Sequence, residues 1–347
     1  MRIAITTAQV PFIRGGAELM TASLRSALEK NGHHVEIVSM PFVFNSMSAI
    51  MENMDCWAKQ DFDRFDIGYI DRVICLKFPT YYLNHHNKIV WLMHQHRGVY
   101  DLWDTSYGNS SLDAESYAMR NKIIEMDTRN LSNANKIYTI SKTVSKRLQL
   151  FNNIASEALY QPSPLADHLG PGDQNPYILC PSRLEGLKRQ DLLIKAAARC
   201  KSPCVFLIAG TGSMGPSLQQ MIDEFDLQHK VRLLGFVSDN ELIELYRNSL
   251  GVFFAPFDED YGFVTLEAMQ SAKPVITCVD SGGPLEFVTD GETGYVVAPE
   301  PDAIAEAIDA LYADRTRARE VGMNAFHAYN ALGLSWDRVV HTLLEQA

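Results

Sequence analysis

The chain has 347 residues, of which 46% are hydrophobic and 21% charged, a composition typical of a folded globular protein. Its 31 basic and 42 acidic residues give a net charge of −11, which excludes a nucleic-acid-binding protein because that class needs a basic surface. The length exceeds that of one ordinary hydrophobic core and predicts two domains.

The charge is divided unevenly along the chain. Residues 1–170 carry 17 basic and 17 acidic side chains, whereas residues 171–347 carry 14 and 25. The neutral first half is the better candidate for contact with an anionic lipid surface, and a solvated acidic face is the simplest interpretation of the second half. The six cysteines form no CxxC pair, which is typical of free thiols in a reducing compartment. We therefore expect a cytoplasmic protein, with peripheral contact at the inner face of a membrane as a further option.

Strand and helix patterns alternate along the first half. Short apolar runs predict strands, and apolar residues at helical spacing predict helices. The predicted strands are residues 2–7, 33–40, 71–78, 88–94 and 136–141. The predicted helices are residues 15–32, residues 113–131 and a segment capped by Ser141. This alternation predicts a parallel sheet covered by helices.

Residues 161–176 concentrate proline, glycine and polar residues, which is typical of a linker. The alternation then resumes. The predicted strands are residues 177–182, 204–210, 230–236, 251–256, 274–279 and 294–299. The predicted helices are residues 190–200, 215–227, 239–249, 302–312 and 314–330, with two more beginning near 264 and 335. We therefore expect an α/β protein with two doubly wound, Rossmann-like domains that face each other across a ligand-binding cleft.

Two glycine-rich segments are candidate ligand loops. Residues 210–215 match GxGxxG after a strand, but the next strand lacks the acidic residue that holds the ribose of a dinucleotide, so a tight turn is the preferred interpretation. Gly15 and Gly16 follow the first strand and open a helix, where free backbone N–H groups suit a phosphate or sugar oxygen. A flexible loop–helix junction explains these two glycines equally well.

Two cations follow the predicted strand 177–182. Arg183 and Lys188 lie in the loop at its carboxyl end, where a planar arginine fork and a lysine point charge can clamp a diphosphate. A solvated basic loop is the alternative, and the acidic character of this half of the chain favours the functional interpretation.

Two carboxylates flank the start of a predicted core helix. Glu259 lies in an acidic loop, Gly262 permits a close backbone approach, and Glu267 lies in or just after the first helical turn. Carboxylates in these places suit the hydroxyl pairs of a sugar and a ribose, whereas an exposed loop residue and a helix cap are the alternative. The backbone N–H groups expected to point outward and hold an anion are those of Phe263, Val264 and Thr265.

Four short motifs, given next from the N-terminus to the C-terminus, have to be considered together. They are Gly-Gly-Ala-Glu at 15–18, Arg183-x4-Lys188, Glu259-x7-Glu267 and SGGPLEFVTDGETGYVV at 281–297. Together they resemble the retaining glycosyltransferases of family GT4, which have the GT-B fold, over nearly the whole chain. The resemblance implies a transferase, and polysaccharide or lipid-linked glycan biosynthesis is a common setting for that family.

The resemblance implies a role for each motif residue. Glu267 would hold the ribose hydroxyls of a nucleotide sugar, and Glu259 would contact hydroxyls of the transferred sugar. Arg183 and Lys188 would neutralise the diphosphate, and Gly16 would let the first loop approach it. The segment bordering the base would be Gly235, Phe236 and Val237.

His94 is the candidate active-site residue of the first half. It is expected to end the strand 88–94 and to project into the cleft, where members of the family keep a histidine near the reacting sugar. His96 is its rival, and the pair lacks a third ligand, so no metal site is expected. The candidates for an acceptor pocket are Arg97, Tyr100 and Trp103, with packing as an equally good interpretation.

The resemblance also implies the domain assignment. The last helix of the family crosses back to the first domain, and Ser335-Trp336 matches its start. The expected domains are therefore residues 1–165 plus 335–347 on the acceptor side, and residues 171–330 for the nucleotide sugar.

The implied reaction moves a sugar, with retention of configuration, from a nucleotide diphosphate sugar to a glycan, lipid-linked or small-molecule acceptor. The leaving phosphate takes the acceptor's proton, and no cofactor or metal is expected. Residues 258–260 match the DxD motif of metal-dependent transferases, but that motif belongs to a different fold. The alternatives are a sugar-nucleotide 2-epimerase of the same fold and a non-catalytic nucleotide-sugar-binding protein.

Overall fold

The computed structural model describes residues 1–12, 15–43, 46–64, 68–108 and 113–345. The chain divides into two units, which we call the first unit (Met1–Gln161 with Ser335–Ala347) and the second unit (Pro162–Leu334). Each unit contains one six-stranded sheet whose neighbouring strands are all parallel. Two parallel sheets with crossover helices confirm the predicted α/β class.

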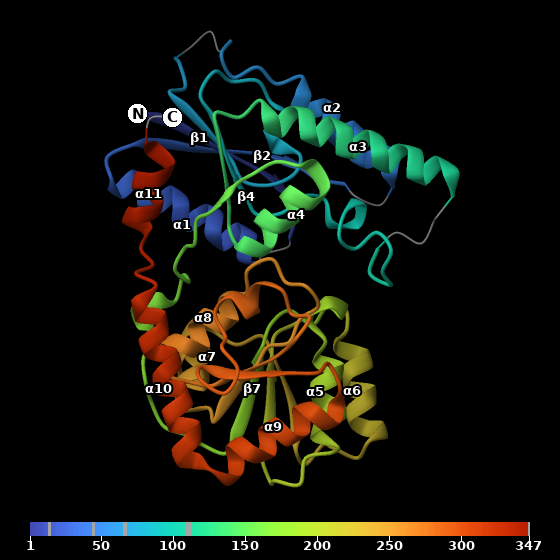
Figure 1. Ribbon diagram of the computed structural model, residues 1–347, viewed down its shortest axis with the longest axis vertical. Helices are drawn as coiled ribbons and strands as arrows, with labels where there is room; N and C mark the ends of the chain where they lie inside the picture. Colours follow the sequence, from blue (N-terminus) through green and yellow to red (C-terminus); the bar gives the residue numbers. More distant parts are fainter. Residues whose placement is uncertain (13–14, 44–45, 65–67, 109–112, 346–347) are drawn as a thin grey trace. The chain divides into compact units, whose positions relative to one another are not determined.

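The first sheet has the strand order β2-β1-β3-β4-β5-β6. Its strands are β1 (Arg2–Gln9), β2 (His34–Pro41), β3 (Arg72–Cys75), β4 (Lys88–Leu92), β5 (Lys136–Thr139) and β6 (Glu157–Ala158). The helices of this unit are α1 (Gly16–Lys30), α2 (Met47–Ala58), α3 (Ala114–Ser132), α4 (Lys142–Asn152) and α11 (Trp336–Leu344), with short 3₁₀ turns η1 (Thr80–Tyr82) and η2 (Arg97–Val99). Figure 1 shows α1 and α11 on one face of the sheet and α2 and α3 on the other.

The second sheet has the strand order β12-β11-β10-β7-β8-β9. Its strands are β7 (Tyr177–Pro181), β8 (Val205–Ala209), β9 (Val231–Gly235), β10 (Gly251–Phe253), β11 (Val275–Cys278) and β12 (Gly294–Val297). The helices of this unit are α5 (Gln190–Ala197), α6 (Gly215–Glu224), α7 (Asp239–Asn248), α8 (Phe263–Gln270), α9 (Pro301–Ala313) and α10 (Arg315–Ala331), with 3₁₀ turns η3 (Ala166–His168), η4 (Gly186–Lys188) and η5 (Gly283–Glu286). The chain runs outward from β7 in one direction and from β10 in the other, so these neighbours form the switch point of the sheet.

Local signals account for the helix boundaries that the sequence predicts well. The side chain of Ser141 accepts a hydrogen bond from Val144 N at the start of α4, and Ser335 caps α11 in the same way. The central strands β3, β4, β10 and β11 are buried along their whole length, because helices cover both faces of a parallel sheet.

Two elements of the first unit lie outside the sequence prediction, and the predicted strands 71–78, 88–94 and 136–141 are all too long. Helix α2 buries Ile50, Met54 and Trp57, a helical spacing that the sequence contained. Strand β6 has two residues and no pattern of its own. The predicted strand 88–94 ends at Leu92, because the pairing with β5 stops there although the apolar run continues.

The C-terminal helix belongs to the first unit. The guanidinium of Arg72 in β3 donates to the carbonyl of Leu343 (2.7 Å), and the rings of Trp91 and Trp336 lie 6.2 Å apart. These contacts hold α11 against the first sheet. Among the described helices, none combines the length and the apolar character needed to cross a membrane.

Candidate functional site

The candidate site of the second unit lies at the switch point of its sheet. Strands β7 and β10 pair directly, with Ile178 opposite Gly251 and Leu179 opposite Val252. Arg183 and Lys188 follow β7, whereas Glu259 and the start of α8 follow β10, so both predicted groups leave the sheet from neighbouring strands at the same edge. This edge is the usual ligand site of a doubly wound sheet.

Lys188 and Glu259 form an ion pair. The Nζ of Lys188 lies 2.5 Å from Glu259 Oε2, and the two side chains are 18% and 20% exposed. The ammonium also lies over the ring of Phe254, 5.6 Å from its centre. The residues predicted for the diphosphate and for the sugar are thus brought together. Arg183 is exposed, and its carbonyl accepts a hydrogen bond from Gln190.

Glu267 is a buried carboxylate on the second turn of α8. It accepts hydrogen bonds from the hydroxyls of Ser163 (2.5 Å) and Tyr246 (2.7 Å), and only 7% of the residue is exposed. Burial raises the pKa of the Glu267 carboxyl, while these two hydroxyl donors favour its charged form. Ser163 comes from the predicted linker and Tyr246 from α7, so neither partner could be found from a local motif.

The start of α8 is shaped by Gly262. This residue has φ 87°, a conformation that favours glycine, and a Cβ there would lie 2.8 Å from the ring of Phe254. Phe263 and Val264 are half-buried, and helix geometry leaves their N–H groups without intrahelical acceptors. The N–H of Thr265 donates to the carbonyl of Gly262 (3.0 Å), so the prediction of three outward-pointing amides is wrong at this position.

Two loops pack backbone to backbone beside this helix. Glu259 bridges to Gly282, with Glu259 N donating to Ser281 O (2.9 Å) and Gly283 N donating to Glu259 O (2.7 Å). A Cβ on Gly282 would lie 2.6 Å from Glu259 O, which is closer than real Cβ contacts. The SGG segment therefore supports the loop that carries Glu259.

Arg189 is a positioning residue that the sequence prediction missed. Its guanidinium pairs with both carboxylate oxygens of Asp280, at 2.8 and 2.7 Å, and also donates to the carbonyls of Ala255 and Pro256. It thereby ties the loop after β10 to the loop after β11. The sequence around Arg189 does not show whether this arginine forms a buried bidentate ion pair or is an exposed cation.

The GxGxxG segment is a tight turn against the loop after β7. A Cβ on Gly210 would lie 1.9 Å from Ser182 O, and one on Gly212 would lie 2.4 Å from Leu184 O. These close approaches account for both glycines without a ligand. Gly235, at the end of β9, has φ 69° and accepts from Gly210 N (2.8 Å), and Val237 follows it half-buried.

In the first unit, Gly15 and Gly16 lie where β1 gives way to α1. The N–H of Gly15 donates to Glu18 Oε2 (2.9 Å), and Glu18 in turn lies 3.5 Å from the Nζ of Lys77, which follows the neighbouring strand β3. The junction is therefore ordered by a capping carboxylate and a cation, which is more than a flexible connection requires.

His94 lies two residues beyond the end of β4, which corrects the expectation that it ends the strand. Its Nδ1 lies 2.7 Å from the carbonyl oxygen of Gln95. The rival residue His96 packs against the rings of Phe42 and Phe78, at 5.9 and 5.6 Å. Burial lowers the pKa of His96 to about 4, with His94 adding to the shift, so the His96 ring is neutral at pH 7.

The three candidates for an acceptor pocket have other partners in the first unit. Arg97 forms an ion pair with Asp101, with 2.6 Å between Nη2 and Oδ2. Tyr100 and Trp103 are 2% and 1% exposed. An acceptor pocket needs accessible side chains, so the burial of both rings favours packing for them.

Two further features of the first unit lie away from the predicted residues. Asp63, His85 and His86 gather possible metal-ligand atoms within 4.8 Å of one another before the start of β4. The Nδ1 of His85 accepts from Asn87 N, so its Nε2 carries the proton that is donated to Ile70 O and is not available to a metal.

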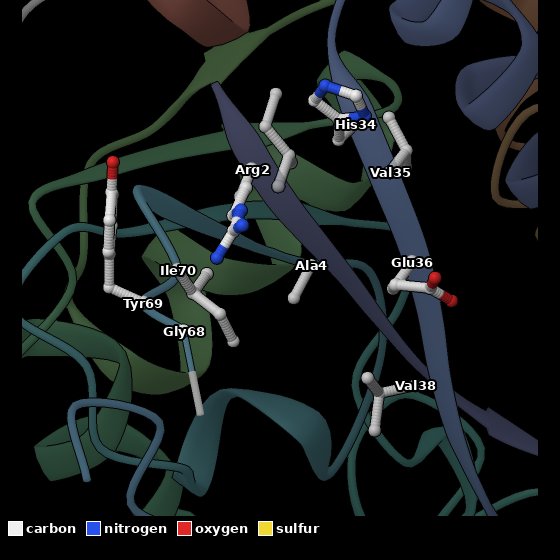
Figure 2. A pocket seen from close by; sticks show the side chains of 10 residues that line it. Arg2, Ala4, His34, Val35, Glu36, Val38, Gly68, Tyr69 and Ile70 are labelled. Atoms are coloured by element: carbon white, nitrogen blue, oxygen red, sulfur yellow. The ribbon is translucent and has the colours of Figure 1, made fainter. Parts of the chain in front are cut away.

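Figure 2 shows the second feature, a pocket of about 430 Å³ against β1 and β2. Its polar side chains are Arg2, His34 and Glu36, and the wall opposite is formed by Gly68, Tyr69 and Ile70. Arg2 is the first residue of β1, so much of the pocket lies toward the amino ends of the strands. The candidate residues follow the carboxyl ends.

Known proteins resemble the chain in both sequence and structure. Residues 166–328 match the family described as "Glycosyl transferases group 1". A D-inositol 3-phosphate glycosyltransferase of Nocardia farcinica is 31% identical over 188 residues, which cover 51% of this chain and 41% of the relative. The alpha-1,3/1,6-mannosyltransferase ALG2 of Mus musculus is 39% identical over 92 residues, which cover 26% of this chain and 22% of the relative. The chain thus spans less than half the length of these curated relatives.

Solved structures match over nearly the whole chain. A sucrose-phosphate synthase from Thermosynechococcus elongatus has a TM-score of 0.80 at 17% identity and covers 99% of this chain and 97% of its own. WaaG, described as a glycosyltransferase involved in lipopolysaccharide biosynthesis, has a TM-score of 0.74 at 13% identity and covers 99% and 100%. At these identities the likeness establishes the fold, which is GT-B. Residues 166–328 therefore match the group 1, GT4-type glycosyltransferases in sequence, in agreement with the resemblance found in the motifs.

Proposed function

We propose that the protein is a retaining glycosyltransferase that moves a sugar from a nucleotide diphosphate sugar to a glycan, lipid-linked or small-molecule acceptor without a metal ion. One observation carries the proposal: Lys188, Glu259 and the start of α8 leave neighbouring strands at the switch point of the second sheet, and Glu267 lies on the same helix. A structural neighbour from Anabaena, with a TM-score of 0.68, is described in complex with UDP and with UDP-glucose, which makes UDP the first nucleotide to test.

The proposed chemistry rests on charge stabilisation. Transfer builds negative charge on the leaving diphosphate, and Lys188, Arg183 and the N–H groups at the start of α8 are suited to stabilise it. Lys188 is already held by Glu259, so a bound diphosphate would compete for the same ammonium and release Glu259 toward sugar hydroxyls. In this mechanism the acceptor's proton goes to the leaving phosphate, and His94 contributes near the reacting sugar.

The test begins with binding. A thermal-shift screen against UDP, GDP, ADP and their sugars should raise the melting temperature with one base, because a ligand of the native state stabilises it. The selected donor is then incubated with an acceptor panel, with and without EDTA, and the product's anomeric configuration is read by NMR. Inverted product, or activity that EDTA abolishes, would contradict the retaining or the metal-free part of the proposal.

The same assay separates the alternatives. An epimerase would convert the nucleotide sugar with no acceptor present, and a binding protein would be stabilised by it without turnover. Contact with an anionic membrane through the first unit is also a proposal, supported by the neutral charge balance of residues 1–170. Equal binding to neutral and anionic vesicles, or none to either, would count against it.

A further inference from the structure

A buried carboxylate of the first unit has no role in the proposed chemistry. Asp127, on α3, is 0% exposed, and its two oxygens accept hydrogen bonds of 2.6 Å from the hydroxyls of Tyr82 and Tyr100. Tyr82 belongs to η1, which follows β3, whereas Tyr100 comes directly after η2, which follows β4. Asp127 therefore joins two separate segments, and only one of them carries His94.

A second buried group reaches the segment of His94 from α4. The Nδ2 of Asn152 donates to Thr128 Oγ1 (2.7 Å) and lies 3.5 Å from the hydroxyl of Tyr100, and its Oδ1 accepts from the side-chain amide of Gln95. Asn152 and Gln95 are 6% and 4% exposed. Buried hydrogen-bonded polar groups contribute little more stability than apolar side chains of the same shape. They do, however, restrict the surrounding segments to one conformation.

The backbone of Gln95 completes the connection. Its carbonyl oxygen lies 2.7 Å from Nδ1 of His94, and a carbonyl can only accept a hydrogen bond. The proton of the neutral imidazole is therefore on Nδ1, and the lone pair is on Nε2. The hydrogen bond from the Gln95 side chain to Asn152 holds residue 95 in place, and it thereby also fixes the backbone carbonyl that His94 contacts.

We propose that Asp127, Tyr100, Asn152 and Gln95 are positioning residues that fix the orientation and tautomer of His94. The inference rests on the proposed function, since it assumes that His94 acts on the sugar or the acceptor. It adds residues from α3 and α4 that contact no predicted substrate group. If the network served stability alone, breaking its bond to the segment after β4 and breaking its bond to the segment after β3 would affect catalysis equally.

The matched pair Tyr100→Phe and Tyr82→Phe tests that distinction. Each variant removes one hydroxyl and one 2.6 Å hydrogen bond to the same carboxylate. We expect Tyr100→Phe to lower kcat about tenfold to a hundredfold through misplacement of His94, with little change in the donor KM. Tyr82→Phe should lose a similar amount of thermal stability and keep kcat within about threefold of the wild type, because η1 does not carry His94. Equal kcat losses, or an unchanged kcat in Tyr100→Phe, would overturn the proposal.

A second readout separates this inference from the proposed function. In ¹⁵N-histidine-labelled protein, with His94 assigned by its loss in His94→Gln, the wild type should show a protonated Nδ1 and an unprotonated Nε2. Tyr100→Phe, and Gln95→Met as a second variant, should shift His94 toward a mixture of tautomers, whereas Tyr82→Phe should not. A wild-type His94 protonated on Nε2 would refute the network even if transfer is observed. The expected spectra without any transfer would instead place the failure in the proposed function.

Discussion

Glu267 combines burial with two hydroxyl partners, Ser163 and Tyr246. If it also holds the donor ribose, Glu267→Gln should weaken nucleotide-sugar binding about tenfold to a hundredfold, because hydrogen bonds to a charged group contribute about 1.5–3 kcal/mol. Isothermal titration calorimetry with the nucleotide found in the screen measures this change.

Tyr246→Phe is the matched control for Glu267. It removes one of the two hydroxyl donors and leaves the carboxylate in place. Donor affinity should stay within about threefold of the wild type, while the free energy of unfolding of the second unit should fall by about 1.5–3 kcal/mol. Equal affinities of Glu267→Gln and the wild type would remove the ribose role.

Asp127 predicts a pH dependence of stability. Burial raises the pKa of its carboxyl from 3.8 to about 6, so between these values the native state binds more protons than the unfolded state. The free energy of unfolding should therefore fall as pH rises through this window, by about 3 kcal/mol in total, and change little from this group above it. Asp127→Asn cannot titrate, so its stability relative to the wild type should rise with pH between about 4 and 6.

The tryptophans make this measurement specific to the first unit. All four, Trp57, Trp91, Trp103 and Trp336, lie in that unit, so urea unfolding followed by intrinsic fluorescence reports on it. If the free energies of unfolding of Asp127→Asn and the wild type differ by the same amount at every pH from 4 to 7, the carboxyl of Asp127 has an ordinary pKa.

At the scale of elements, the loop that carries Glu259 depends on the SGG loop beneath it. Gly282 and Gly291 have nearly the same φ, 69° and 71°, but only a Cβ on Gly282 meets the backbone of Glu259, whereas one on Gly291 has no neighbour within 4 Å among the described residues. Gly291→Ala should cost about 1–2 kcal/mol from backbone strain alone. Gly282→Ala should cost more and should also lower donor affinity, because it displaces Glu259 and with it Lys188.

Calorimetry measures the stability that each alanine variant loses, and donor titration measures its donor affinity. Together they distinguish backbone strain, which both variants share, from the steric contact with Glu259, which only Gly282→Ala introduces. Donor affinities that fall equally would indicate that the Glu259 loop does not depend on close packing against Gly282. A stability loss restricted to Gly291→Ala would refute the steric argument altogether.

At the scale of the whole molecule, the C-terminal helix returns to the first unit, although the 173 residues from Pro162 to Leu334 belong to the second. Leu343 on α11 is 0% exposed, whereas Asp337 on the same helix is exposed. Leu343→Ala should destabilise the first unit by about 2–5 kcal/mol, and Asp337→Ala should have little effect. Tryptophan fluorescence follows the loss, and nucleotide binding by the second unit should persist in both variants. Loss of binding in Leu343→Ala, with the second unit still folded, would show that the units act as one.

The sequence was informative where the relevant signal is local. Ser141 and Ser335 mark helix starts because a cap bonds to a backbone N–H three residues away. The alternation of buried strands and helices predicted both parallel sheets, and the four motifs together indicated the glycosyltransferase family whose model matches residues 166–328. The helix α2 was missed although its apolar spacing was present, and the end of β4 was misplaced because hydrophobicity does not show where strand pairing stops.

Most of the alternating strands and helices, the α/β class and the likeness to a glycosyltransferase family were therefore determined by the sequence itself, since capping, periodicity and motif spacing depend on neighbouring residues. Only the tertiary structure decided that Lys188 pairs with Glu259, that Arg189 and not Arg183 clamps Asp280, and that Tyr100 is buried on Asp127. It also decided that Glu267 meets Ser163, 104 residues away in the sequence. Such contacts depend on which loops the folded sheets bring to one edge, and no pattern within a short stretch of chain specifies that.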